Sequence, residues 1–251
     1  MLTAERIKAK AKELGFDLCG IAPADNFPEL AYLEEWLARG YAGDMAYMSR
    51  SAERRADVRN VVAGARTVIV TGTIYNTTGE DHRCGPVSAG PSDAIIARYA
   101  LGDDYHDVLK RRLDALLEWM RATSPAVFDA RAYVDTGPVQ ERVYAQYAGL
   151  GWIGKNTCLI NAEHGSWLFL AEIITTLDLE PDTQALEQCG IVPSMPRCMP
   201  HRGAGRRWCA GFDPLHLVPD DRASHRHSRA ISTRLDQSCL RLRHLSGRLS
   251  V

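Results

Sequence analysis

The chain has 251 residues, of which 45% are hydrophobic and 24% are charged, and its formal net charge is −1. These values indicate a globular protein with one large domain or two unequal ones, and they give no global argument for binding nucleic acid or a membrane surface. No apolar run approaches the roughly 20 residues of a membrane span. Met1 leads directly into an amphipathic pattern without a signal peptide, so we expect a cytoplasmic protein whose seven cysteines are thiols or metal ligands.

Short helical and strand patterns alternate along the first 180 residues. In chain order we expect a helix over 4–14 capped by Thr3, a strand over 17–22, a helix over 27–39, a basic helix-compatible segment over 43–59, a strand over 66–74, a loop over 77–92, a helix from about 104 to 121, and strands over 130–134, 157–161 and 166–176. This alternation predicts an α/β (α+β) sheet domain with flanking helices.

The segment VDTGPVQERVYAQYAGLGWIGKNT, residues 134–157, contains the densest group of functional residue types. Asp135 follows an apolar run, Pro138 is predicted to open a helix that ends near Gly149, and a glycine-rich loop containing Lys155 comes next. An acid at a strand end, beside a helix N-terminus and with a cation nearby, is typical of proton-transfer sites. A capping aspartate followed by a packing loop is the structural alternative, and the pattern alone leaves both open.

The same segment, followed by GSWLFLAEIITTL and then by EPD and CG, resembles the epoxyqueuosine reductase family from about residue 4 to Gly190. The string AGLGWIGKNT is long and unusual in composition, which makes chance agreement improbable. The resemblance implies reduction of an epoxide on a modified base of a tRNA anticodon loop, the last step of queuosine synthesis. It further implies cobalamin, two [4Fe–4S] clusters, an electron donor and a monomer.

The resemblance also implies roles for individual residues. Asp135 would protonate the departing oxygen and would be held protonated by a desolvated site over the corrin. The expected cofactor-binding residues are Arg55, Ala97, Arg98, Tyr99, Tyr105, His106, Lys155, Asn156, Leu159 and Leu170.

Each of these assignments has a structural alternative. The basic segment 43–59 is also consistent with a solvated face, His106 with a helix cap, and the leucines with ordinary core. Two other functions remain open: a relative of the reductive dehalogenases, and a non-enzymatic protein that binds cobalamin or RNA.

The composition changes abruptly after Gly190. Residues 1–190 contain thirteen Glu and five Lys, whereas residues 191–251 contain neither and hold eleven Arg and five His. The family carries CxxCxxCxxxCP in this region, because four thiolates must converge on each cluster. Here the cysteines at 189, 198, 209 and 239 match no such spacing, and Cys189 alone stays in register as a metal ligand.

A reading-frame test offers an explanation. With suitable codons, CMPHRGA (198–204), FDPLHLVPDDR (212–222) and residues 240–251, read one base out of step, yield ACPTGAL, STRCISYLTI and YGCDICQAVCP. We therefore hypothesise a one-nucleotide frameshift near Gly190. It would leave a catalytic domain over 1–180 and an irregular remnant of the ferredoxin-like domain over 181–251, with activity impaired for lack of cluster ligands. The alternative is a genuine tail that binds a metal through Cys198, His201 and Cys209, although that spacing matches no standard zinc pattern.

Overall fold

The structure is a computed structural model that describes residues 2–76, 97–100 and 102–186. These residues form two compact units, the first containing 2–30, 53–76, 97–100, 102–153 and 158–186 and the second containing 31–52 and 154–157. The elements are α1 (Ala4–Glu13), β1 (Leu18–Pro23), α2 (Pro28–Ala38), α3 (Ala46–Arg50), α4 (Ala52–Ala56), the 3₁₀ turn η1 (Val58–Asn60), β2 (Thr67–Ile74), η2 (Arg98–Ala100), α5 (Tyr105–Thr123), β3 (Ala130–Tyr133), α6 (Glu141–Tyr147), β4 (Trp152–Ile153), β5 (Leu159–Ile160) and β6 (Leu168–Thr175).

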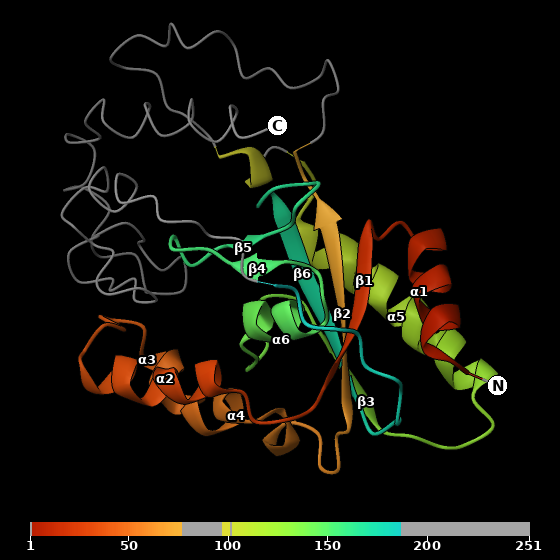
Figure 1. Cartoon of the computed structure of the whole chain (residues 1–251), viewed down its shortest axis with the longest axis horizontal. Helices are drawn as coiled ribbons and strands as arrows, with labels where there is room; N and C mark the ends of the chain where they lie inside the picture. Colours follow the sequence, from red (N-terminus) through yellow and green to blue (C-terminus); the bar gives the residue numbers. More distant parts are fainter. Residues whose placement is uncertain (1, 77–96, 101, 187–251) are drawn as a thin grey trace, which may run out of the picture. The chain divides into compact units, whose positions relative to one another are not determined.

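A four-stranded antiparallel sheet in the order β1-β2-β6-β3 forms the centre of the first unit (Figure 1). The predicted sheet domain with flanking helices is confirmed. The last strand of the described residues, β6, lies between β2 and β3. Its residues pair with β2 from Thr67↔Thr175 to Ile74↔Leu168, and with β3 from Ala130↔Thr175 to Tyr133↔Glu172. The end of β3 therefore lies beside Glu172 in the middle of β6.

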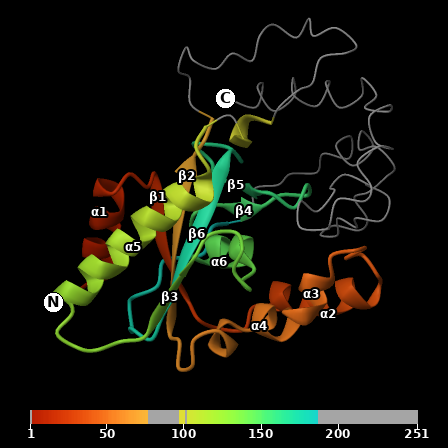
Figure 2. The same ribbon diagram turned by 180° about the vertical axis from the view of Figure 1, so that it is seen from behind.

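Helices cover both faces of this sheet, with α1 and α5 on one side and α6 on the other (Figures 1 and 2). The residues of β6 pack alternately against the helices on the two faces, because successive side chains of a strand point to opposite faces of the sheet. Ala171 and Ile173 pack with α1 and α5, whereas Leu170 and Ile174 pack with α6.

The helices α1 and α5 begin where the sequence predicted. Thr3 caps α1 by accepting a hydrogen bond from the Arg6 N–H at 3.4 Å. Asp104 caps α5 in the same way, accepting from the His106 N–H at 2.9 Å. An apolar stripe of α5 is buried against the sheet at Leu109, Leu113, Leu116, Leu117 and Met120.

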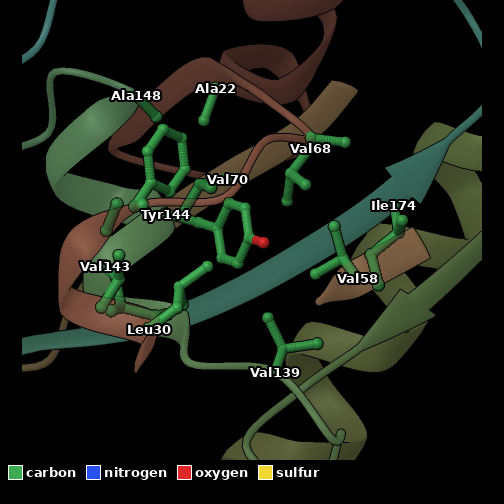
Figure 3. Close-up of a cluster of buried hydrophobic side chains, with 14 of the residues drawn as sticks. Ala22, Leu30, Val58, Val68, Val70, Val139, Val143, Tyr144, Ala148 and Ile174 are labelled. Atoms are coloured by element: carbon green, nitrogen blue, oxygen red, sulfur yellow. The ribbon is translucent and has the colours of Figure 1, made fainter. Parts of the chain in front are cut away.

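Tyr144 of α6 is fully buried in the core on the other face of the sheet (Figure 3). Its ring packs edge-on against Phe27, with the centroids 5.5 Å apart. A side chain on Gly20 of β1 is excluded, because its Cβ would lie 2.1 Å from the Ala148 carbonyl oxygen at the end of α6. Glycine at this position lets the helix approach the strand closely.

The second unit contains residues 31–38 of α2 together with α3. Its small core consists of Leu33, Trp36 and Ala42, and the Trp36 ring packs edge-on against Tyr41 at 6.5 Å. The predicted basic segment 43–59 is divided among α3, α4 and η1 rather than forming one helix. None of the helices in the described residues combines the length and apolarity of a membrane span.

Two local predictions were wrong. Pro138 does not open a helix, because α6 begins at Glu141. The Gln140 side-chain amide instead donates hydrogen bonds to the carbonyls of Leu30 (3.2 Å) and Arg55 (3.1 Å), which hold the chain before α6 against its neighbours. The glycine-rich loop is also more regular than predicted, since β4 within it pairs with β5.

Candidate active site around Asp135

Asp135 occupies a tight turn directly after β3. Its φ is +53°, and the turn is closed by a hydrogen bond of 2.5 Å from the Thr136 N–H to the Val134 carbonyl oxygen. A left-handed conformation costs a non-glycine residue on the order of 1 kcal/mol, although aspartate tolerates it better than most residues. Gly137 completes the turn, because a Cβ there would lie 2.6 Å from the Tyr133 ring. The turn leaves the Asp135 side chain 55% exposed.

The first turn of α5 supplies two partners for this carboxylate. The Tyr105 hydroxyl donates a hydrogen bond to Asp135 Oδ2 at 3.0 Å, and His106 Nε2 lies 3.4 Å from the same oxygen. Burial, reinforced by the negative charge of Asp135, raises the pKa of Tyr105 well above its ordinary value. Tyr105 therefore remains a neutral hydrogen-bond donor at physiological pH.

The other ring nitrogen of His106 is held by Asp104. His106 Nδ1 lies 2.8 Å from Asp104 Oδ1, the same oxygen that caps the helix. Hydrogen bonds from His106 lower the pKa of Asp104, so this carboxyl is ionised. Two carboxylates thus flank one imidazole, an arrangement in which the imidazole can pass a proton to Asp135.

An aromatic cluster, defined here as Tyr99, Tyr105, His106 and Phe169, surrounds these polar contacts. Tyr105 stacks on Phe169 with the centroids 4.2 Å apart and the planes 5° apart, and on His106 at 4.0 Å. Tyr99 meets Tyr105 edge-on at 6.5 Å and is itself 53% exposed. The cluster therefore fixes the Tyr105 ring while presenting an aromatic surface to solvent.

Arg98 lies beside this cluster on η2. Its guanidinium donates a hydrogen bond to the Asn76 side-chain oxygen and lies over the Trp167 ring, 5.6 Å from the centroid. These contacts attach η2 to the residues next to the end of β2 and the start of β6. Ala97 precedes η2 and is exposed.

The remaining predicted residues are placed in several different environments. Arg55 of α4 donates a hydrogen bond to the Val139 carbonyl oxygen at 3.2 Å. Leu159 and Leu170 are 4% and 9% exposed and lie in the core that contains Tyr144. This burial is also what their alternative interpretation as ordinary core residues predicts. Lys155 and Asn156 belong to the second unit, and Cys189 lies outside the described residues.

Sequence reasoning missed two acidic residues near the turn, Glu141 and Glu172. Glu172 is 0% exposed in the middle of β6, and Glu141 is the first residue of α6. A charged residue inside the otherwise apolar strand LFLAEIIT was a signal that could have identified Glu172.

The described part of the chain contains no group of three or more His, Cys, Asp or Glu side chains arranged to hold a metal ion. Its cysteines are Cys19 and Cys158, neither of which forms a disulfide, and burial raises the pKa of the Cys19 thiol to about 12. A thiol this hard to ionise is a poor cluster ligand, because the thiolate is the ligating form. Cys19 therefore does not fit an iron–sulfur site.

Comparisons with known proteins identify the family. A family model described as epoxyqueuosine reductase QueG, DUF1730, matches residues 55–136. The epoxyqueuosine reductase of Gloeobacter violaceus is 42% identical over 250 residues, covering 94% of this chain and 75% of the relative. That of Xanthomonas campestris pv. campestris is 38% identical over 227 residues, covering 87% of this chain and 63% of the relative. This chain therefore belongs to the epoxyqueuosine reductase family.

Solved structures agree with this assignment. A crystal structure of epoxyqueuosine reductase with an epoxyqueuosine-modified tRNA-Tyr stem loop has a TM-score of 0.71 and 26% identity, covering 82% of this chain and 54% of that one. The epoxyqueuosine reductase of Bacillus subtilis has a TM-score of 0.68 and 26% identity. It was solved with its catalytic loop, which is named after an aspartate, swung out of the active site. This chain thus spans little more than half the length of the solved relatives.

Proposed function

We propose that this chain carries the catalytic part of an epoxyqueuosine reductase, which converts epoxyqueuosine in a tRNA anticodon stem loop to queuosine. The observation that carries the proposal is the exposed Asp135 carboxylate, presented by a left-handed turn and contacted by Tyr105 and His106. The relative solved with an epoxyqueuosine-modified tRNA stem loop supports the choice of substrate. The relative whose catalytic loop is named after an aspartate supports the role of Asp135.

The overall reaction requires two electrons and two protons. The two carbon–oxygen bonds of the epoxide break, a carbon–carbon double bond forms, and the oxygen leaves as water. In our proposal His106 passes a proton to the Asp135 carboxylate, which delivers it from Oδ2 to the departing oxygen, and Tyr105 holds that oxygen atom of the carboxyl in place. His106 then supplies the next proton to the same atom, and Asp104 stabilises the imidazolium that forms when His106 is protonated.

The residues next to Asp135 fit cobalamin. A corrin is a flat macrocycle edged by amide groups, and the exposed Tyr99 ring, the small Ala97 and the Arg98 guanidinium offer it an aromatic surface and a donor. These residues, together with Arg55, Tyr105 and His106, would hold the cofactor from the first unit. Leu159 and Leu170, which are buried in the core that contains Tyr144, would support these residues from within the first unit. Bound cobalamin would supply the electrons through its reduced cobalt.

We further propose that a frameshift near Gly190 separates this catalytic part from an intact two-cluster domain. The support is the compositional change at that residue and the three cluster phrases in the alternative frame. In an intact product Cys189 would be a cluster ligand, and electrons would enter from a cellular donor. Resequencing the DNA across the Gly190 codon tests this proposal. A single-base difference that restores CxxCxxCxxxCP would support it, and a confirmed frame would refute it.

The catalytic proposal is tested by single-turnover reduction of an epoxyqueuosine-containing stem loop, with purified chain, added cobalamin and a low-potential chemical reductant in place of the clusters. Asp135→Asn should lower the rate by a factor of about 100 or more, since the amide cannot donate an acidic proton. Asp129→Asn is the matched control, because Asp129 is an exposed acid at the opposite end of β3. Failure of the chain to bind cobalamin, or equal rates for both variants, would refute the proposal.

A further inference from the structure

The turn that carries Asp135 is fixed to the protein at both of its ends. Val134, the residue before Asp135, is buried in the core beneath α1 and α5. Val139, at the other end, is buried in the core beneath α6 (Figure 3), and its carbonyl oxygen accepts a hydrogen bond from Arg55 at 3.2 Å. The segment 134–139 therefore crosses the end of β3 from one face of the sheet to the other.

Tyr133, the last residue of β3, lies directly against this turn. Its side chain packs on the core that α6 covers. A Cβ on Gly137 would lie 2.6 Å from Cγ, 2.7 Å from Cβ and 2.8 Å from Cδ1 of Tyr133. All three of these atoms belong to the base of one side chain, so the backbone at Gly137 rests on the Tyr133 ring where it joins its Cβ.

The backbone conformation of Gly137 does not explain why a glycine is present there. Its φ lies outside the left-handed region, whereas the φ of Asp135, two residues earlier, is +53°. The close approach to Tyr133 is the reason instead, because the space between them holds a hydrogen atom but not a methyl group. The contact between Gly137 and Tyr133 therefore determines how near to the end of β3 the turn can lie.

We propose that Tyr133 is a positioning residue for Asp135, because its ring supports Gly137 and thereby fixes the position of the turn. This proposal deepens the proposed function, since it rests on Asp135 as the proton donor. Tyr105 and His106 contact Asp135 Oδ2 from α5 at 3.0 and 3.4 Å. A turn displaced from the Tyr133 ring would move that oxygen away from both partners, and a misplacement of about 1 Å can cost about 100-fold in rate.

Hydrogen exchange of the Thr136 amide tests the contact in the full chain, without cofactor or substrate, because this N–H closes the turn by donating to the Val134 carbonyl oxygen. Gly137→Ala and Tyr133→Ala should each lower the protection of this amide by about three- to tenfold, the effect of weakening one hydrogen bond. The double variant should be no worse than the more severe single variant, because one contact can be lost only once. Tyr133→Phe keeps the ring and should match the wild-type chain.

Gly102→Ala is the matched control, because a Cβ at Gly102 has open space around it and should leave the protection unchanged. Wild-type protection in Gly137→Ala, effects that multiply in the double variant, or equal losses in Tyr133→Phe and Tyr133→Ala would each overturn the proposal. If the variants fail to fold, the wild-type chain decides the matter by nuclear magnetic resonance. The Hα protons of Gly137 should show Overhauser contacts with the Tyr133 ring and an upfield ring-current shift, and the absence of both would overturn the proposal.

The single-turnover assay then measures whether the position of the turn matters to the reaction. At saturating stem loop Tyr133→Ala should lower the rate by about 100-fold while the Kd for the stem loop stays unchanged, and Tyr133→Phe should retain the wild-type rate. A lost turn contact with an unchanged rate would overturn the positioning role. The exchange measurements do not depend on epoxide reduction, and the proposed function is tested separately by Asp135→Asn, so the two failures are distinguishable.

Discussion

Replacing Glu172 by glutamine should make the folded chain more stable, and increasingly so as the pH rises. Glutamine has the same shape as glutamic acid but has no proton to lose. In the wild-type chain the folded state keeps Glu172 neutral, because burial raises its pKa well above the ordinary value of 4.5. The unfolded state ionises freely above that value and is thereby favoured.

The sign and size of the effect follow from proton linkage. Below pH 4.5 both states hold the proton, so this residue contributes no pH dependence. Above it the free energy of unfolding of the wild-type chain falls by about 1.4 kcal/mol per pH unit, until the folded pKa is reached. The advantage of Glu172→Gln over wild type should therefore grow by about 1.4 kcal/mol per pH unit above pH 5, until the folded pKa of Glu172 is reached.

Urea unfolding of both proteins at pH 5, 6, 7 and 8 measures this difference. The pH dependence separates ionisation from the cost of burying an amide, since that cost is the same at every pH. Glu163→Gln, an exposed substitution, should show no such trend. A difference between Glu172→Gln and wild type that stays constant from pH 5 to pH 8 would refute the reasoning.

Three further substitutions have defined outcomes. Tyr105→Phe keeps the ring stacking and removes the donor to the Asp135 carboxylate, the proposed proton donor, so the single-turnover rate should fall about 10- to 100-fold while the urea midpoint stays within error. Gly20→Ala should lower the free energy of unfolding by about 3 kcal/mol or more, because its Cβ would overlap a backbone oxygen at 2.1 Å, whereas Gly102→Ala, with open space around it, should cost under about 1 kcal/mol. Asp182→Asn should cost about 1–2 kcal/mol in the same assay, since a lysine and a backbone N–H share that carboxylate, whereas Asp178→Asn in an exposed pair should cost under about 1 kcal/mol. Equal effects within either of the last two pairs would contradict the packing and charge arguments.

The elements of the first unit were largely predictable from sequence, because periodicity and capping are local signals. Thr3 and Asp104 mark the starts of α1 and α5, and the apolar stripe of α5 has helical spacing. The start of α6 was not predictable in this way, because Gln140 holds the preceding residues through contacts with chain more than eighty residues away. The order of the strands in the sheet was not predictable from local sequence either, because it depends on pairing between segments that are far apart in the chain.

The candidate site was partly predictable. The resemblance pointed to Asp135, Tyr105 and His106, and the structure brings these three side chains together. The positive φ of Asp135 and the buried carboxyls of Glu141 and Glu172 were not predicted, since both depend on how β3, β6 and α6 pack. Local sequence indicates which residue types are present, but only tertiary packing determines which of them lose water.

The position of β6 between β2 and β3 also has a consequence for protein synthesis. The ribosome releases β6 after every other strand of the sheet, so the nascent chain holds β2 and β3 without their shared neighbour until Thr175 has emerged. Until then two unpaired strand edges are available for pairing with other chains. A translational pause just before β6 would therefore be the most hazardous for aggregation. A change of reading frame after Gly190 comes too late to disturb the sheet.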